Sequence, residues 1–210
     1  MLSAFSILLI GFVLGMRHAT DADHVVAVTT IVSDQPSLLR ASTVGALWGI
    51  GHSITILLVG GAIILLHVTI PPRLGLAMEF SVALMLIVLG AVNLSGRRRA
   101  AVSPARPIAV GFVHGLAGSA FVALLVLAAV PSPWLGLFYL ALFGFGTVAG
   151  MALITIAIAL PSALSARRFS HLQGYLRVAS GLASVGFGLL LVQHGIADGL
   201  FSGAPQWTPR

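Results

Sequence analysis

The sequence predicts an all-α polytopic membrane protein with six transmembrane helices, arranged as a 3+3 inverted repeat. The chain of 210 residues is 58% hydrophobic and only 8% charged, whereas soluble domains are typically about 25% charged. Its apolar runs are repeatedly long enough to cross a bilayer. Two stretches of the first half also return, in the same order, in the second half. We therefore expect a single transmembrane domain over residues 1–210.

Turn-forming residues divide the chain into six apolar segments. The breaks contain Asp, Gly, Ser and Pro, as in Pro71-Pro72 and Pro131-Ser132-Pro133, and such residues end helices or favour turns. The first segment is longer than a bilayer requires and contains a polar run, so we expect it to bend or break there. In chain order, the predicted helices span residues 3–31, 41–66, 74–94, 107–130, 134–160 and 172–196.

The arginines predict how these helices are oriented. Every basic residue is an arginine; eight lie in or beside loops on one side of the predicted bundle, and two lie on the other. An excess of arginine marks the cytoplasmic side of a membrane protein. We therefore predict a multi-pass protein of the cell membrane, with loops 96–106 and 161–171 in the cytoplasm and both termini outside. The eight are Arg40, Arg97, Arg98, Arg99, Arg106, Arg167, Arg168 and Arg177, and the two are Arg73 and Arg210.

Two short stretches indicate an internal repeat. Residues 11–15, GFVLG, resemble residues 111–115, GFVHG, and residues 46–51, ALWGIG, resemble residues 141–146, ALFGFG. Three helices per unit is an odd number, so the second unit enters the membrane upside down. Inverted repeats recur in transporters, with the substrate site near the midplane between the repeats. The predicted repeats cover residues 1–95 and 107–200.

A polar run interrupts the first helix. Residues 17–24 read RHATDADH, and the sixteen residues before them carry no charged side chain. An Asp or Arg at the bilayer centre costs about 2.5–3.5 kcal/mol on insertion scales. Arg17 and Asp21 are four residues apart and can pair on one helix face. Such a pair leaves two histidines and a second aspartate unexplained, and a polar cluster this dense in a membrane helix indicates a functional site.

The spacing of these residues limits how they can act. His18, Asp21 and His24 form a slanted stripe on a helix that turns about 100° per residue. His18 and His24 would lie about 9 Å apart along a straight helix, too far to bind one ion directly. Either the helix breaks here, or the two histidines serve successive positions on a path. Asp23 points to another face, where it would orient a histidine ring.

Histidines of two other helices lie at matching depths. His52 lies near the centre of the second helix, as His18 does in the first, and His114 is displaced toward the cytoplasm, as His24 is. This suggests a ladder, with His18 and His52 at the midplane. Asp21 would come next, and then His24 with His114, although packing and ligation are equally open for His114. The predicted metal ligands are His18, Asp21, Asp23, His24, His52 and His114.

These residue types narrow the identity of a bound ion. The chain has no cysteine, so thiolate sites and disulfides are excluded. Imidazole with carboxylate suits Ni²⁺, Co²⁺, Zn²⁺ or Cu²⁺, whereas Mg²⁺ and Ca²⁺ prefer oxygen ligands. Ligand histidines must be neutral, so protons compete with the metal. We expect transport to weaken below about pH 6.5, the reference imidazole pKa.

The polar run resembles the signature of a known family. His18, four further residues, then Asp23 and His24 are similar to the metal motif of the nickel/cobalt transporters (NiCoT, within the NicO superfamily). Gly51-His52-Ser53 is similar to the second histidine motif of that family, and residues 111–121 resemble its short, urease-accessory UreH-type members. The resemblance implies translocation of Ni²⁺ or Co²⁺, with metal recognition by His18, Asp23, His24 and His52.

The chain also departs from that family. Typical NiCoT members have eight helices, whereas this chain has room for six, and the motif Leu-Gly-Phe-Asp-Thr-Ala-Thr-Glu of the longer members is absent. Metal preference and the direction of transport therefore stay open.

Three functions follow in order of preference. The first is a permease for a divalent transition-metal cation, Ni²⁺ or Co²⁺, that needs no prosthetic group and is not an enzyme. The second is an accessory membrane subunit for metal delivery, as for urease. The third is an intramembrane metalloenzyme, which the absence of a His-Glu-X-X-His motif disfavours. The expected partners are the metal ion and the bilayer but not nucleic acid, because no basic stripe alternates with aromatic residues. Homo-oligomers and complexes with other transport or urease components stay open.

Overall fold

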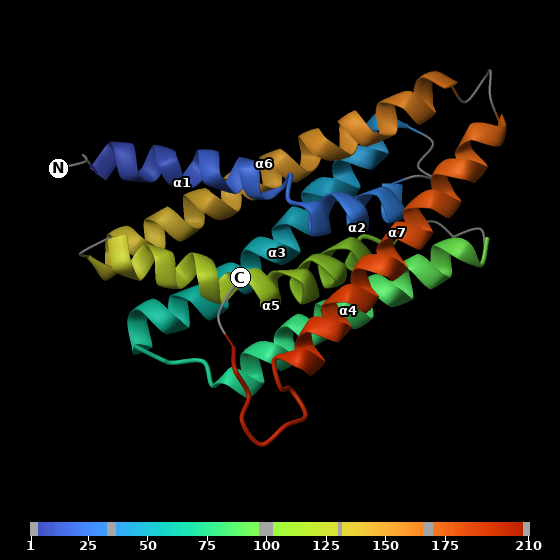
Figure 1. Ribbon diagram of the computed structural model, residues 1–210. Coiled ribbons are helices and arrows are strands. Elements are labelled where there is room, and N and C mark those ends of the chain that lie inside the picture. The colour runs from blue at the N-terminus through green and yellow to red at the C-terminus, as the bar shows by residue number, and fades with distance from the viewer. Residues whose placement is uncertain (1–3, 33–36, 97–102, 130–131, 166–169, 208–210) are drawn as a thin grey trace.

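The computed structural model describes residues 4–32, 37–96, 103–129, 132–165 and 170–207, and the side chains of these ranges except 118–129, 161–165 and 170–173. The described residues form helices and connecting turns without a strand, which confirms the all-α fold (Figure 1). The helices are α1 (Ala4–His18), α2 (Ala22–Val32), α3 (Leu38–Leu66), α4 (Pro72–Leu94), α5 (Ala105–Ala129), α6 (Pro133–Ser165) and α7 (Ser170–Ala197).

Several of these helices have the length and composition of membrane spans. Among the described residues, α3, α4, the Pro133–Leu160 part of α6 and the Gly174–Ala197 part of α7 are long and apolar enough to cross a bilayer. Helices α1 and α2 pass the same test together as a pair bent by 55°, and would make a fifth span if counted as one. The chain is thus a polytopic membrane protein, and the break predicted in the first segment is confirmed.

The helix ends follow from local sequence. Ser37 caps α3: its side-chain oxygen accepts a hydrogen bond from the backbone N–H of Arg40 at 3.3 Å. At the other end of α3, His67 has φ 50° and stops the helix in the left-handed conformation. Pro72 begins α4, where the missing N–H of a proline costs nothing. The predicted break at Pro71-Pro72 therefore does separate two helices, whereas α6 continues to Ser165, beyond its predicted end at residue 160.

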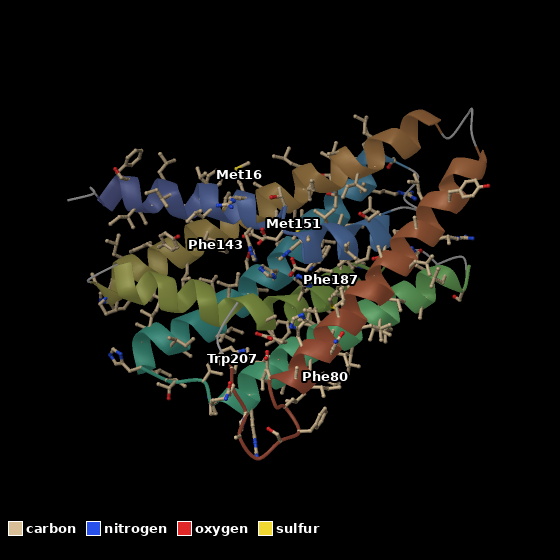
Figure 2. All side chains as sticks on the ribbon, in the orientation of Figure 1. Met16, Phe80, Phe143, Met151, Phe187 and Trp207 are labelled. Carbon is tan, nitrogen blue, oxygen red and sulfur yellow. The ribbon has the colours of Figure 1, made fainter. Side chains whose placement is uncertain are left out.

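Helix α3 is the centre of the bundle and packs along both α5 and α6. Helix α1 packs on α6, and α4 pairs with α7 on the other side. Figure 1 shows that α1, α4 and α6 run in one direction across the molecule, and that α3, α5 and α7 run in the other. The main apolar core surrounds Trp48 and Met151, with Phe187 of α7 packed against it (Figure 2).

Glycines let two helix pairs approach each other to backbone contact. A Cβ at Gly15 of α1 would collide with the carbonyl oxygen of Phe143 on α6. A Cβ at Gly111 of α5 would collide in the same way with the carbonyl oxygen of Trp48 on α3. Small residues allow such close helix contacts in membranes, where no hydrophobic effect drives helices together.

Polar contacts join α4 to α7, including a hydrogen bond from the amide of Asn93 to the hydroxyl of Ser180 at 3.0 Å. The side-chain amide of Asn93 donates to the backbone carbonyl of Arg177 at 3.1 Å. The hydroxyl of Ser184 donates to the backbone carbonyl of Leu86 at 2.8 Å. Asn93 and Ser184 are both buried, so each contact satisfies a polar group that lipid could not.

The arginine-rich loops lie only partly within the described residues. Arg40, Arg106 and Arg177 lie at or near the first turns of α3, α5 and α7, at the ends of these helices that meet on one side of the molecule in Figure 1. The predicted cytoplasmic residues 97–99, Arg167 and Arg168 lie outside the described residues.

Candidate metal centre

The polar run RHATDADH forms the break between α1 and α2. The backbone N–H and the hydroxyl of Thr20 both donate to the carbonyl of Arg17, at 2.8 and 2.6 Å, and the N–H of Asp21 donates to the carbonyl of His18 at 3.1 Å. These bonds form a tight turn, after which α2 starts in a new direction. The bend brings the ring centroids of His18 and His24 to 4.5 Å. The two rings are therefore no longer separated by the distance that a straight helix would impose.

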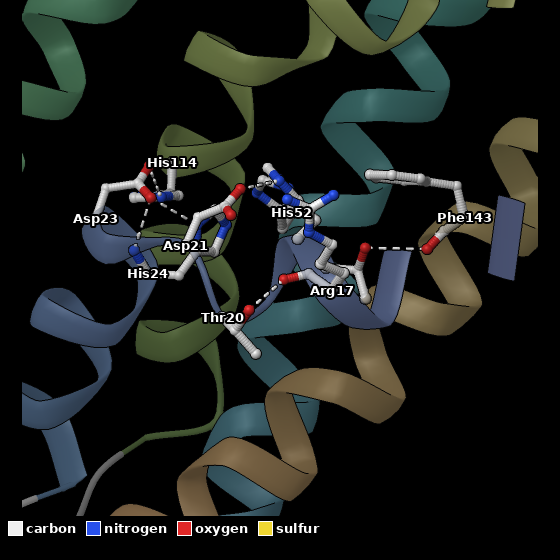
Figure 3. Close-up of polar contacts among 10 residues, drawn as sticks. Arg17, Thr20, Asp21, Asp23, His24, His52, His114 and Phe143 are labelled. Carbon is white, nitrogen blue, oxygen red and sulfur yellow. Dashed lines mark hydrogen bonds and ion pairs between the residues drawn. The ribbon is translucent and has the colours of Figure 1, made fainter. Parts of the chain in front are cut away.

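Four imidazole rings meet at this break. His24 of α2 is their centre, because its ring centroid lies 4.5 Å from that of His18, 5.0 Å from that of His52 and 4.3 Å from that of His114. His52 comes from α3 and His114 from α5, so three parts of the chain build the cluster (Figure 3). His24, His52 and His114 are fully buried, and His18 is half-buried.

The two aspartates bond to different histidines. Asp23 lies in the first turn of α2; its Oδ1 is 3.0 Å from Nδ1 of His24, and its Oδ2 is 3.1 Å from Nε2 of His114. The carboxylate thus holds two rings, as Figure 3 shows. Asp21 is bonded instead to His18, with 2.8 Å between Oδ2 and Nδ1, and its side chain is 53% exposed. On the other side of the same ring, Nε2 of His18 lies 3.1 Å from Nε2 of His52.

Buried ring nitrogens without a hydrogen-bond partner are the chief sign of a ligand. Within the described residues, Nε2 of His24, Nδ1 of His52 and Nδ1 of His114 have none. A buried polar atom without a partner is costly and needs an explanation. Imidazole nitrogens with carboxylate oxygens form the donor set that transition-metal ions accept, and a cation could occupy lone pairs that the protein leaves unused.

The ligand atoms fall into two groups, each with all its atoms within 4.8 Å of one another. We call them the first and the second subsite. The first subsite consists of His18, His24 and His52, and the second of Asp23, His24 and His114.

The structure brings together all six residues that the sequence singled out, and their role as metal ligands stays a prediction. Two details differ from what we expected. Asp21 lies beside His18 and not between His18 and His24, whose rings are in direct contact. Asp21 also bonds to His18 and not to Arg17, because the break removes the helical i,i+4 geometry. Asp23 does contact histidine rings, as its position predicted.

Two aromatic residues that border the cluster were not predicted from the sequence. Trp48 of α3 stacks on His24, with ring centroids 6.1 Å apart, and also contacts His114 edge-on. Phe143 of α6 lies 5.4 Å from His18. A signal for them was present: Trp48 and Phe143 occupy the same position in the repeated stretches ALWGIG and ALFGFG.

Known proteins resemble this chain along most of its length. The urease accessory protein UreH of Bacillus sp. (strain TB-90) is 35% identical over 217 aligned positions, which cover 93% of this chain and 95% of that protein. The Arabidopsis thaliana chloroplast proteins FOR GROWTH AND FERTILITY 2 and 1 are 28% and 27% identical, over 87% of this chain. The chain spans 55% and 57% of the length of these two.

No family model matches the chain, and no solved structure matches it. The similarity to the bacterial protein extends over nearly the whole of both sequences. The chain belongs to the family of UreH, the short members of the nickel/cobalt transporter (NicO) superfamily.

Proposed function

We propose that this protein is a permease for a divalent transition-metal cation, Ni²⁺ or Co²⁺, and not an enzyme. One observation carries the proposal: four imidazoles and two carboxylates from α1, α2, α3 and α5 converge inside a membrane protein. Charged groups at this depth are costly, and a cation that passes through the membrane supplies the reason to keep them. Their chemistry suits Ni²⁺ and Co²⁺ better than Mg²⁺ or Ca²⁺.

We further propose that six spans form two inverted three-helix halves, with α1 and α2 together corresponding to α5, α3 to α6, and α4 to α7. The corresponding helices run in opposite directions in Figure 1, which supports the inversion. Contacts between the halves also come in reciprocal pairs. Gly15 of the first half approaches Phe143 of the second half, and Gly111 of the second half approaches Trp48 of the first.

A second reciprocal pair supports the same correspondence. A Cβ at Gly146 of α6 would collide with the carbonyl of Phe12 on α1, and a Cβ at Gly51 of α3 would collide with the carbonyl of Ile108 on α5. The same number of positions along the chain separates Phe12 from Ile108 and Gly15 from Gly111. This match differs by four residues, about one helical turn, from the match of Gly11 to Gly111 suggested by the sequence.

Hydrogen bonds between α4 and α7 also come in a reciprocal pair. The same number of positions along the chain separates Asn93 from Ser184 and Leu86 from Arg177, so the bonds Asn93–Arg177 and Ser184–Leu86 are each other's counterparts. Three independent sets of contacts therefore support a pseudo-twofold relation between the halves.

The proposed orientation has both termini outside and loops 96–106 and 161–171 in the cytoplasm. Arg40, Arg106 and Arg177 lie at helix ends on one side of the molecule in Figure 1, and Arg73 lies in the first turn of α4 on the other. This asymmetry supports a cytoplasmic position for the first three.

The test is Ni²⁺ and Co²⁺ flux into liposomes that contain the purified protein. We expect flux with wild type and a loss of at least tenfold with His18→Ala, His24→Ala and His52→Ala, because losing supporting groups at a metal site already costs about 10–100-fold. His67→Asn is the matched control, since it removes an exposed imidazole at the end of α3 and asparagine also accepts the left-handed backbone of that position. Equal flux in wild type and all three cluster variants would contradict the proposal.

A second candidate is an accessory membrane subunit that delivers metal to an enzyme. The printed name of the bacterial relative, urease accessory protein, favours it. The liposome experiment separates the two: flux through the protein alone supports a permease, whereas Ni²⁺ binding without flux supports an accessory subunit.

A further inference from the structure

The two subsites share one residue, His24, and are otherwise separate. Its ring lies between the other three imidazoles, 4.5 Å from His18 and 4.3 Å from His114, whereas His52 and His114 are 5.9 Å apart. Each subsite therefore has its own remaining ligands, and no other residue belongs to both.

The repeat correspondence puts the subsites on opposite sides of the site. His18 and His114 are separated by the same number of positions as Gly15 and Gly111, so they correspond to each other in the proposed repeat. In an inverted repeat the pseudo-twofold axis lies in the membrane plane, so that it exchanges the two faces of the membrane. His18 of the first subsite and His114 of the second are then displaced toward opposite faces.

The carboxylates follow the same division. Asp21, 53% exposed, is bonded to His18 of the first subsite. Asp23, 33% exposed, belongs to the second subsite and is bonded to His114. Each subsite thus has a partly exposed carboxylate next to buried imidazoles, as expected if each receives or releases the ion on its own side.

His24 has two ring nitrogens, and only one of them can be a ligand at a time. Neutral imidazole carries a proton on one nitrogen and a lone pair on the other. Nδ1 of His24 faces Asp23, and Nε2 has no hydrogen-bond partner among the described residues. An ion in the first subsite and an ion in the second would therefore compete for the same ring.

We propose that the transported cation occupies the two subsites in succession, with His24 as a ligand in both. His24 hands the ion from one subsite to the other, and the cluster holds one ion at a time. This relay rests on the proposed transport function and adds to it a path with two stations.

The test separates the subsites with three variants of the whole protein. His52→Ala disables the first subsite only, and His24→Ala disables both. His114→Gln disables the second subsite, while its amide can still bond to Asp23 if folding depends on that contact. Ni²⁺ stoichiometry in detergent, Ni²⁺ X-ray absorption to count imidazole ligands, and liposome flux are measured for each, with His67→Asn as the control.

We expect one Ni²⁺ per chain in wild type, His52→Ala and His114→Gln, and a drop of about 100-fold or more in affinity for His24→Ala. The two single-subsite variants should differ in coordination, with more imidazole ligands in His114→Gln than in His52→Ala. Both should lose at least about tenfold in flux although they still bind the ion.

Three results would overturn the relay: two Ni²⁺ ions bound to the cluster together, the same coordination in both variants, or wild-type flux in His114→Gln. The coordination result decides whether two separate subsites exist, whatever the flux. If the two variants differ in coordination but the wild-type protein carries no flux, the transport function is wrong and the two subsites are still supported.

Discussion

Asp21 and Asp23 are only two residues apart, yet they have different surroundings. Asp23 bonds through its two oxygens to two buried imidazoles, and it joins α2 to α5. Within the described residues, the carboxylate of Asp21 bonds to the ring of His18 alone, and half of its side chain is exposed. The bend at residues 19–21 causes the difference, because it turns the first residues of α2 toward the core.

This difference predicts unequal effects of two matched substitutions. Asp23→Asn removes a charge that orients two ligand rings, and we expect Ni²⁺ affinity to fall by about 10–100-fold. Asp21→Asn removes a charge at the surface of the cluster, where solvent weakens electrostatic interactions, and we expect less than about a threefold loss. Calorimetric titration of both purified variants with Ni²⁺ measures the ratio. Equal losses would show that Asp21 is as much a ligand as Asp23.

At the scale of the helices, close backbone approach determines how the elements pack. Helix α1 reaches α6 at Gly15, and α5 reaches α3 at Gly111, in both cases against a carbonyl oxygen. A carbonyl on a helix cannot move aside as a flexible side chain would, so an added methyl group must push the two helices apart. Since the cluster spans α1, α2, α3 and α5, any such shift also displaces its histidines.

We therefore predict that Gly15→Ala and Gly111→Ala each destabilise the protein by about 1–3 kcal/mol. Gly186→Ala on α7 is the control, because a Cβ there meets no atom within 4 Å. It should be neutral, or stabilising by up to about 1 kcal/mol through the better helix propensity of alanine. Thermal unfolding in detergent compares the three variants. A loss of stability in Gly186→Ala as large as in the other two would rule out the packing argument.

The sequence was sufficient for the elements but not for their arrangement. Long apolar runs and their Pro and Ser boundaries predicted the segments that became α3 to α7, and the polar run predicted the break between α1 and α2. Membrane helices are apolar on every side, so hydrophobic periodicity does not reveal which faces pack together. The order of Asp21 and His18, and the walls formed by Trp48 and Phe143, depend on the bend angle and on contacts between distant segments.

At the scale of the whole molecule, the arginines and the helix directions combine into one orientation. Helices α3, α5 and α7 begin on the side with Arg40, Arg106 and Arg177. After α7, the chain folds back over the beginning of α4, where the indole N–H of Trp207 donates to the carboxylate of Glu79 at 2.9 Å. The segment that ends at Trp207 therefore lies on the side opposite to the three arginines.

Cysteine labelling tests this orientation directly, because the chain has no cysteine and gives no background. Ala204→Cys follows α7, and Ser103→Cys precedes α5; both positions are exposed. We expect a maleimide that cannot cross membranes to label Ala204→Cys in intact cells, and to label Ser103→Cys only after the membrane is opened. The reverse pattern would invert the orientation.

The hydrogen bonds within the cluster have a consequence for ion selectivity. The contacts of His18 with His52, and of Asp23 with His24 and His114, hold these side chains in position. The cage is therefore preorganised, and little of the binding energy is spent on building it. We therefore expect the cluster to favour ions that exchange their water for imidazole over Mg²⁺, which keeps most of its hydration shell. Selection among ions would then follow from how the side chains of the cluster are arranged.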